Sequence, residues 1–513
     1  MARLSRRLQR HGVALVLTAA LLARLWGLNF GLPGLAVTDE GSDIAASLRL
    51  ARAEWNSGRD FHRVLLPLVE LPFFAAYYVG LRAAGAVHTL SEFRDLYFAD
   101  RSGFTLIARL LSVTSGVGAV GLVYAIGRRL GDAWTGLMAG GLLAVNFFHS
   151  YYSHVAIPDV MASTFGLLTI WCALEVMRSG STRAYVAMGA CASLTLLAKV
   201  NAIFVAAPVA LIALAGAWRD RGLRQAGRGA AAALVAGLIA LPLFNPLIVL
   251  RPAGVWADIQ DLFGRIYVGH SVSSPPPWLL NLQTLLLMGG WPLLATALAG
   301  LFVSFARPTR ERLALGLAST AFALVVARTG SLNPNYWLPL IPLAALSAAL
   351  AISSLMARLG YERLAWPVGL LSLALIAWEA LPTIQTDVLL ARPDTRQLAV
   401  ADLQRLLPPG AAILMGDPFV YSMPLWRNER SISRLAAMTG TTLDTYQWWL
   451  DRPADARPGP SYDLYGPEFN GQVSDETVIA FAAEHQIEYV IQTDYCTGEA
   501  ASPSVIGFPH IPA

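Results

Sequence analysis

The sequence predicts an all-α polytopic membrane domain followed by a small α/β domain. Of its 513 residues, 55% are hydrophobic and only 14% are charged, far from the composition of a soluble globular protein. A helix of about 20 apolar residues crosses the ~30 Å hydrocarbon core of a bilayer. We identify eleven expected transmembrane helices, at about 12–30, 104–126, 133–148, 158–177, 184–199, 201–217, 229–250, 282–303, 313–328, 335–356 and 364–381.

The arginine distribution predicts how these spans are oriented. Arginines are enriched in cytoplasmic loops, and with eleven spans the basic segments all fall on one side. These segments are the N-terminus, 128–129, 178–183, 219–228, 307–312 and 358–363. The loops around Asp39 and before Asp159, the turn at Lys199, residues 251–281 and the tail fall on the other side. We expect a multi-pass protein of the cytoplasmic (inner) membrane with these acids and the tail on the extracytoplasmic side.

Two segments bear on this count of spans. Arginines and an apolar core at the N-terminus resemble a signal peptide, but no small-x-small cleavage site follows, so we expect an uncleaved first span. Residues 64–84 are apolar, yet Pro67, Glu70 and Pro72 leave only about eleven clean apolar residues, too few to span. We expect 64–84 to form an interfacial helix in the first outer loop.

The tail, residues 383–513, has a different composition and predicts a second domain. It carries eight Arg against sixteen Asp and Glu, although the chain as a whole has a net charge of +4. Asp394 can cap a helix that runs to Leu406, residues 411–415 have the pattern of a buried strand, and a helix near Ser474 precedes a strand at 489–491. We expect domains at 1–382 and 383–513, the second a small extracytoplasmic α/β domain.

The adjacent acids Asp39 and Glu40 are the most informative pair in the chain. Ionisable groups at a membrane face are costly to hold and so are rarely idle. A structural explanation is also available, because Thr38 can cap a helix whose first turn carries both acids. Asp159, which follows Pro158, likewise suits the first turn of a helix. Two outer loops that each offer a carboxylate at one membrane depth favour a shared site.

Cations on the same face suggest an anionic ligand. Lys199 is the only lysine in the chain, and Arg251, Arg265 and Arg328 belong to the same outer face by the expected topology. Lys199 can snorkel from a helix end to water or hold a phosphate at the interface, and both roles stay open. Arginine on this face is the minority placement, which favours a phosphate partner.

Aromatic and histidine side chains in two segments have structural explanations first. Residues 147–154 are typical of an aromatic belt at the membrane interface. A metal site there would need His149, His154 and Asp159, whose steps of five residues put them on no common helix face. Trp448 and Trp449 in the tail favour a core or an interface over a sugar-binding platform.

Short motifs along the membrane domain occur in the order found in one family. They are 24–33 (RLWGLNFGLP) before Asp39-Glu40, 109–112 (RLLS), 127–130 (GRRL), 150–153 (SYYS) before Pro158-Asp159, 198–201 (AKVN), 267–270 (YVGH) before 276–278 (PPW), and 336–340 (YWLPL). Their order and spacing over about residues 20–380 resemble the GT-C glycosyltransferases of the protein O-mannosyltransferase and aminoarabinose-transferase type, often called family-39-like. A GT-C-like membrane domain is therefore the expected fold.

The resemblance implies transfer of a sugar from a polyprenyl-phosphate carrier to an acceptor on the outer membrane face. It gives catalytic roles to Asp39, Glu40 and Asp159, with Asp39 as the catalytic carboxylate. The expected phosphate-binding residues are Lys199, Arg251, Arg265 and Arg328, and the expected pocket residues are Tyr152, His154, Asn201, His270 and Tyr336. Many relatives have an arginine immediately before the tyrosine of the late helix, where this chain has Asn335, and Arg328 is a candidate to replace it.

The residue types suit this chemistry on their own terms. A sugar phosphodiester has a good leaving group, so one carboxylate suffices to take the proton of the attacking hydroxyl. Nearby cations can stabilise the departing phosphate, and a single displacement would invert the anomeric centre. We expect a polyprenyl-phosphate sugar donor and a lipid, glycan or protein acceptor as partners, and no nucleic acid. No cofactor is implied, and dependence on a divalent cation is left open.

Two other classes of function compete with the enzyme. A lipid-linked sugar transporter or flippase often shows internal repeats with polar residues at the bilayer midplane, whereas here no duplication is visible and the acids gather at one face. A non-catalytic cell-envelope assembly protein would tolerate loss of both acids.

Overall fold

The computed structural model describes residues 2–34, 37–52, 60–268, 277–329, 334–359, 361–415, 423–440, 442–466 and 475–491. Helices cover all eleven stretches expected to span the membrane. Their bounds are α1 (Ala2–Leu25), α5 (Ser102–Leu130), α6 (Ala133–Ala144), α7 (Phe147–Ser153), α8 (Pro158–Ser179), α9 (Thr182–Ala198), α10 (Ile203–Arg221), α11 (Leu223–Phe244), α14 (Pro277–Ala306), α15 (Arg310–Thr329), α16 (Leu340–Leu359) and α17 (Tyr361–Leu390). The all-α membrane domain is confirmed.

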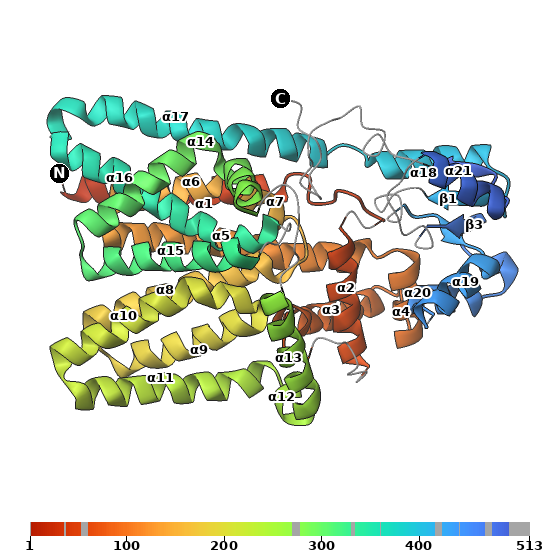
Figure 1. Ribbon diagram of the computed structural model, residues 1–513, viewed down its shortest axis with the longest axis horizontal. Coiled ribbons are helices and arrows are strands. Elements are labelled where there is room, and N and C mark those ends of the chain that lie inside the picture. Colours follow the sequence, from red (N-terminus) through yellow and green to blue (C-terminus); the bar gives the residue numbers. More distant parts are fainter. Residues whose placement is uncertain are drawn as a thin grey trace.

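Two features of these helices differ from the expectation. In the described part of the chain, eight helices are long and apolar enough to cross a membrane, and α3 (Leu65–Ala83), expected at the interface, is one of them. It lies at one end of the bundle beside α2 (Thr38–Ala51) and α4 (Leu90–Ala99) (Figure 1), a position that agrees with an interfacial helix. At the other boundary, α17 runs past residue 382 to Leu390, so the expected domain boundary falls inside a helix.

The two ends of the bundle carry different kinds of segment. The N-terminus and the turns α10–α11, α14–α15 and α16–α17 lie together at the left of Figure 1. The helices α2 to α4, α12 (Leu247–Leu250), α13 (Pro252–Val268) and the C-terminal domain lie at the right. Because the left-hand turns are the arginine-rich ones, the basic segments and the predicted site residues are separated along the bundle as the sequence predicted.

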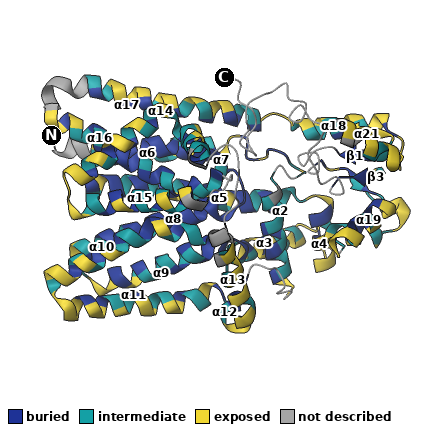
Figure 2. Ribbon diagram, viewed as in Figure 1, coloured by how far each residue is buried: buried dark blue, intermediate teal, exposed yellow. Residues whose placement is uncertain are grey.

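Burial falls from the centre of the bundle to its edge, as expected for helices in lipid. In the most apolar 18-residue stretch of α8, 67% of the residues are buried, against 17% in the corresponding stretch of α11 (Figure 2). From residue 231 onward the exposed positions of α11 are apolar, with Leu234 and Leu238 both more than half exposed. Large apolar side chains facing outward along this length of helix indicate a surface that contacts lipid rather than water.

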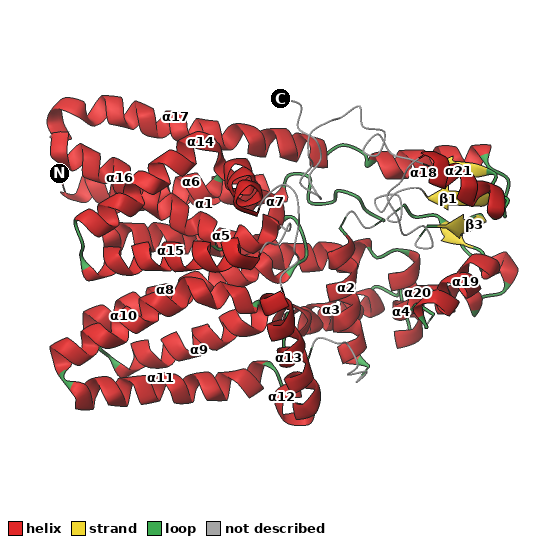
Figure 3. Cartoon of the chain, viewed as in Figure 1, coloured by secondary structure: helices red, strands yellow, loops and turns green. Residues whose placement is uncertain are grey.

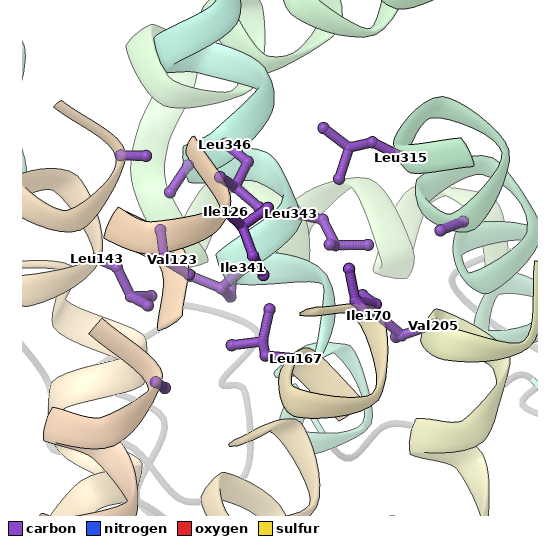
Figure 4. Close-up of a cluster of buried hydrophobic side chains, with 14 of the residues drawn as sticks. Val123, Ile126, Leu143, Leu167, Ile170, Val205, Leu315, Ile341, Leu343 and Leu346 are labelled. Carbon is purple, nitrogen blue, oxygen red and sulfur yellow. The ribbon is translucent and has the colours of Figure 1, made fainter. Parts of the chain in front are cut away.

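Close helix contacts hold the centre together. Side chains from α5, α6, α8, α10, α15 and α16 meet in one buried cluster, part of which Figure 4 shows. Glycine permits two of the closest approaches: a Cβ at Gly189 would lie 1.9 Å from the carbonyl oxygen of Ala233, and one at Gly300 would lie 1.7 Å from that of Ser347. Small residues that let backbones approach are typical of packing between membrane helices.

The tail folds as the small α/β domain that the sequence predicts (Figure 3). The expected helix is α18 (Thr395–Leu406), whose Asp394 cap accepts a hydrogen bond from the backbone N–H of Arg396 at 2.9 Å. The expected strands are β1 (Ala412–Met415) and β4 (Tyr489–Ile491), and the second expected helix is α21 (Asp475–Glu484). The sequence did not predict β2 (Trp426–Arg427), β3 (Ser461–Tyr465), α19 (Glu429–Thr439) or α20 (Asp444–Leu450). The strands form a parallel sheet in the order β2-β3-β1-β4.

The tail domain is docked on the membrane domain through α4. The indole N–H of Trp448 donates to the carboxylate of Asp95 at 3.0 Å, and its ring lies 5.5 Å from that of Phe98. Trp448 and Trp449 are both buried, so the expected core or interface role is the one they have. A shared aromatic cluster with a polar anchor fixes the domain over α2 to α4.

Candidate active site

Asp39 and Glu40 are neighbours in the first turn of α2, but their side chains have opposite surroundings. The side chain of Asp39 is 50% exposed, and its Oδ2 accepts a hydrogen bond from Nη1 of Arg63 at 3.3 Å. Glu40 is fully buried. Successive residues on a helix point about 100° apart, which sends one acid outward and the other into the protein. Asp39 is therefore the member of the pair that a substrate can reach.

Both carboxylate oxygens of Glu40 accept hydrogen bonds from groups of the protein. Nε and Nη2 of Arg109 donate to its two carboxylate oxygens at 2.8 and 2.9 Å, and the backbone N–H of Ala156 donates to Oε1 at 2.9 Å. Arg109 also donates to the carbonyl oxygens of Leu28 and Phe30. This buried ion pair joins α2 to α5, to the turn after α1 and to the loop before α8. We assign Glu40 a positioning role, not the catalytic one expected from the sequence.

Arg63 lies between the carboxylates of Asp39 and Asp43, and the sequence analysis did not identify it as a site residue. Its Nη2 donates to Asp43 at 2.6 Å while its Nη1 reaches Asp39. Although burial opposes the charged form, the carboxylates of Asp43, Asp39 and Asp159 raise the pKa of Arg63 above its ordinary value. Its φ of 62° lies in the left-handed region, which is costly for a residue with a Cβ.

The loop before Arg63 is fixed by contacts with residues at the end of α11 and in the segment from α12 to α13. Asn245 donates to the carbonyl oxygen of Asp60 at 2.8 Å, and Arg251 pairs with the Asp60 carboxylate at 3.2 Å. The carboxylate of Asp258 accepts hydrogen bonds from two successive backbone N–H groups, those of residues 61 and 62. Arg251, an expected phosphate ligand, thus acts here as part of the brace that fixes Arg63.

Asp159 and Lys199 form the second half of the site. Asp159 is in the first turn of α8 and Lys199 follows the last residue of α9, and Nζ of Lys199 lies 2.5 Å from Oδ1 of Asp159. Both side chains are nearly fully buried. Nζ also lies 4.6 Å from the centre of the Tyr336 ring, a cation–π contact. Oδ2 of Asp159 is also buried, and it has no hydrogen-bond partner within the described structure.

Asp39 and Asp159 lie near two of the same side chains. The charge of each acts on Arg63, and the charge of each also acts on the phenol of Tyr152, from α7. Side chains from α2, α7, α8, the loop at residue 63 and the α9–α10 turn therefore converge. Both acids therefore lie near the same two side chains, while their membership of one functional site and the roles of the individual residues stay proposals.

The remaining predicted residues divide into three groups. Asn201 reaches the carbonyl oxygen of Tyr336 through its Nδ2 at 3.5 Å, so both lie beside Lys199. His154 is fully buried, with its ring nitrogens each 2.9 Å from a carbonyl oxygen, those of Ser150 and Trp26, and we do not place it in a pocket. His270 and the side chains of Arg265 and Arg328 lie outside the described residues.

In the described part of the chain, the acids of this arrangement are paired with cationic side chains. Among the described residues, no three His, Cys, Asp or Glu side chains are placed to hold a metal ion. The charge beside Asp39 is that of Arg63, and the charge beside Asp159 is that of Lys199. His149, the third residue of the metal site considered from the sequence, accepts a hydrogen bond on Nδ1 from the buried guanidinium of Arg24 at 2.9 Å. A divalent cation placed among these groups would be repelled by the positive charges of Arg63 and Lys199.

Comparison with known proteins identifies the fold. A family model described as dolichyl-phosphate-mannose-protein mannosyltransferase matches residues 102–249. None of the curated protein sequences compared with the chain matches it. ArnT from Cupriavidus metallidurans, in a crystal structure with undecaprenyl phosphate bound, aligns with a TM-score of 0.52 and 17% identity over 85% of this chain and 90% of that one. The archaeal oligosaccharyltransferase AglB from Archaeoglobus fulgidus, in complex with an inhibitory peptide and a dolichol-phosphate, aligns with a TM-score of 0.50 and 13% identity over 95% of this chain and 69% of that one.

These likenesses agree with the order of motifs read from the sequence. At such low identity the structural matches show the architecture, and the family model covers the part of the chain from α5 to α12 that contains Asp159 and Lys199. The chain has the GT-C-like fold that its sequence motifs predict, and it shares this fold with ArnT and AglB.

Proposed function

We propose that this protein transfers a sugar from a polyprenyl-phosphate donor to an acceptor hydroxyl, with inversion, at the outer face of the cytoplasmic membrane. One observation carries the proposal: a half-exposed carboxylate, Asp39, lies in the same site as a buried Lys199 whose partner Asp159 keeps one oxygen unpaired. Undecaprenyl phosphate and dolichol-phosphate occupy the ArnT and AglB structures, which supports a polyprenyl carrier as the donor.

The residues divide the work of a single displacement. Asp39 takes the proton from the acceptor hydroxyl while the oxygen of that hydroxyl attacks the anomeric carbon of the sugar. The bond from that carbon to the phosphate oxygen breaks, and the electron pair leaves with the polyprenyl phosphate. Lys199 supplies fixed positive charge where the negative charge on the phosphate grows. Because attack and departure occur on opposite faces of the carbon, the product has the inverted configuration.

Arg63 and Asp43 orient Asp39. The guanidinium bridges the two carboxylates, which lie one helical turn apart on α2, and the brace around Asp60 prevents the loop from yielding. A base held in this way needs no reorganisation when the hydroxyl arrives. Oδ2 of Asp159 is placed to accept a hydrogen bond from a hydroxyl of the sugar or of the acceptor.

Transfer is tested with purified protein, a labelled polyprenyl-phosphate sugar and a cell-envelope extract. Label moving to an acceptor supports the enzyme, and label crossing a liposome membrane on the intact lipid would support a flippase instead. Asp39→Asn should lower turnover at least about hundredfold, the usual contribution of a general base. The control is Asp402→Asn, an exposed aspartate of α18 that pairs only with Arg405 nearby. Near-normal turnover in Asp39→Asn would refute the assignment of the base.

The proposed orientation is tested separately from the chemistry. Alkaline phosphatase fused after the tail is active only outside the cytoplasm, whereas a fluorescent protein that requires the cytoplasm for folding should stay dark there. The opposite pattern would place the site on the cytoplasmic face. This result does not depend on whether the sugar donor has been identified.

A further inference from the structure

A cavity of about 1260 Å³ lies on a different face of α2 from Asp39. Its walls are α2, α3, α4, the first turn of α5 and the start of α20 in the tail domain. Asp39, Asp159 and Lys199 are not among its lining residues, so it is distinct from the site described above. Its volume is above the roughly 300–1,000 Å³ of pockets that hold drug-sized ligands, which leaves room for a larger molecule.

The floor of this cavity is aromatic and rigid. Six aromatic side chains line it: Phe74, Tyr78, Phe93, Tyr97, Phe98 and Phe104. Phe104 stands at their centre, with ring centroids of Phe74, Phe93 and Tyr97 between 4.8 and 5.5 Å away. Two apolar side chains at the cavity are exposed, Leu90 by 69% and Leu443 by 56%. A preformed apolar surface that continues to an apolar edge suits the hydrocarbon part of an amphiphile.

The charged residues of the cavity are unbalanced toward positive. Four arginines line it, Arg49, Arg52, Arg94 and Arg101, against the single acid Asp444. Arg52 pairs with Asp444 at 3.5 Å, and Arg94 pairs with Asp95 at 3.2 Å.

Arg49 and Arg101 are the two arginines without an acid. Neither is paired with a carboxylate anywhere in the described part of the chain, and Nε of Arg49 is buried without a hydrogen-bond partner. Arg101 lies over the ring of Tyr97, 5.6 Å from its centre. An unsatisfied buried donor and an unpaired guanidinium over one aromatic floor are complementary to an anionic group such as a phosphate.

The first turns of α2 connect this cavity with the proposed base. Gly41 and Ser42 line the cavity, and Ser42 lies three residues after Asp39, about 4.5 Å along the helix axis. Asp39 and Asp43 face Arg63, whereas Ser42, Ala45 and Arg49 follow the adjacent face of the same helix. A molecule held in the cavity can therefore reach the half-exposed carboxylate around the N-terminal turn of α2.

We propose that this cavity binds the acceptor and that the acceptor is an anionic lipid with a phosphate-bearing headgroup. Its phosphate lies at Arg49 and Arg101, its apolar part lies on the aromatic floor, and its hydroxyl reaches Asp39 past Ser42. A neutral acceptor would leave two guanidinium groups without a partner. That the ligand is the acceptor rests on the proposed function; that the cavity binds an anionic amphiphile does not.

Binding is measured on the full-length protein in detergent, so that the outcome is independent of transfer. The probe is dihexanoyl phosphatidic acid, titrated by isothermal calorimetry. Dihexanoyl phosphatidylcholine has the same apolar part without a net negative charge, and inorganic phosphate has the charge without the apolar part. Phosphatidic acid should bind at least about tenfold more tightly than either, because two charge-assisted contacts and the apolar contact act together. Equal binding of phosphatidylcholine, or of inorganic phosphate, would overturn the proposal.

Variants locate the site. The double variant Arg49→Gln/Arg101→Gln should weaken phosphatidic acid binding at least about tenfold. Ser91→Glu, on the exposed side of the cavity, should weaken it by adding a negative charge, and Arg49→Lys should largely preserve it. The control is Arg430→Gln, an exposed arginine of α19 outside the cavity. Unchanged binding in both the double variant and Ser91→Glu would show that the probe binds elsewhere.

Undecaprenyl phosphate is titrated into the same samples to separate the two hypotheses. At least one binding site for undecaprenyl phosphate should remain in the double variant, since the donor phosphate is proposed to lie at Lys199. Loss of both ligands together would overturn a separate acceptor cavity. If phosphatidic acid binds as expected while no acceptor is ever labelled, the cavity stands and the proposed function fails.

Discussion

The contrast between Asp39 and Glu40 gives the sharpest prediction. Both are acids in the first turn of one helix, yet Glu40 accepts three hydrogen bonds in a fully buried setting and Asp39 accepts one from Arg63 in a half-exposed setting. Glu40→Ala should therefore destabilise the protein strongly, whereas Asp39→Asn should abolish transfer with little change in stability.

The magnitude follows from the partners that each change leaves behind. Glu40→Ala leaves the guanidinium of Arg109 buried without its counter-ion, and breaking a buried pair in this way costs about 3–5 kcal/mol. That is a large share of a typical total stability of roughly 5–15 kcal/mol. Asp39 is half exposed and its ion pair is screened by solvent, so losing it costs about 0–1 kcal/mol.

The assay is thermal unfolding of the full-length protein in detergent, followed by tryptophan fluorescence. Glu40→Ala should melt well below the wild type. Asp39→Asn should melt close to the temperature of the wild type. Replacing both partners, in Glu40→Leu/Arg109→Met, should recover part of the loss, because no buried charge is then left unpaired. If Glu40→Ala melts together with Asp39→Asn, the Glu40–Arg109 pair does not hold α2 and the positioning role is wrong.

Three further predictions concern the donor cation, the strained loop and the tail. Lys199→Met should weaken undecaprenyl phosphate binding at least about tenfold, measured by native mass spectrometry, and should lower the melting temperature. The double variant Lys199→Met/Asp159→Asn should regain stability in melting curves but should not regain binding. Arg63→Gly should be more stable than Arg63→Ala by about 1–2 kcal/mol, because only glycine adopts φ near 62° without strain, and equal melting temperatures would contradict this. Trp448→Ala removes the hydrogen bond to Asp95, so limited proteolysis between the membrane domain and the tail should become faster, and an unchanged cleavage rate would argue against docking through α4.

Most of the fold could be predicted because its signals are local. A membrane span needs only a long enough apolar segment, so each expected helix was found where composition placed it. The cap at Asp394 and the strand at 412–415 were likewise read from a few consecutive residues. The strands β2 and β3 were missed because they are short and gain their stability from neighbours distant in sequence, as the pairing of Ile413 with Leu464 shows.

The sequence by itself predicted that Asp39, Asp159 and Lys199 lie at one end of the membrane domain, since charge in a lipid environment is costly and the order of the spans fixes the side of each loop. Only the tertiary structure decided that Asp39 is half exposed while Glu40 is buried in an ion pair with Arg109. It also decided that Arg63 donates hydrogen bonds to the carboxylates of Asp39 and Asp43. These assignments depend on helix rotation and on contacts between residues far apart in the chain, and no local pattern encodes either. The physical reason is that burial and pairing, which set the role of an ionisable group, are properties of the packed protein.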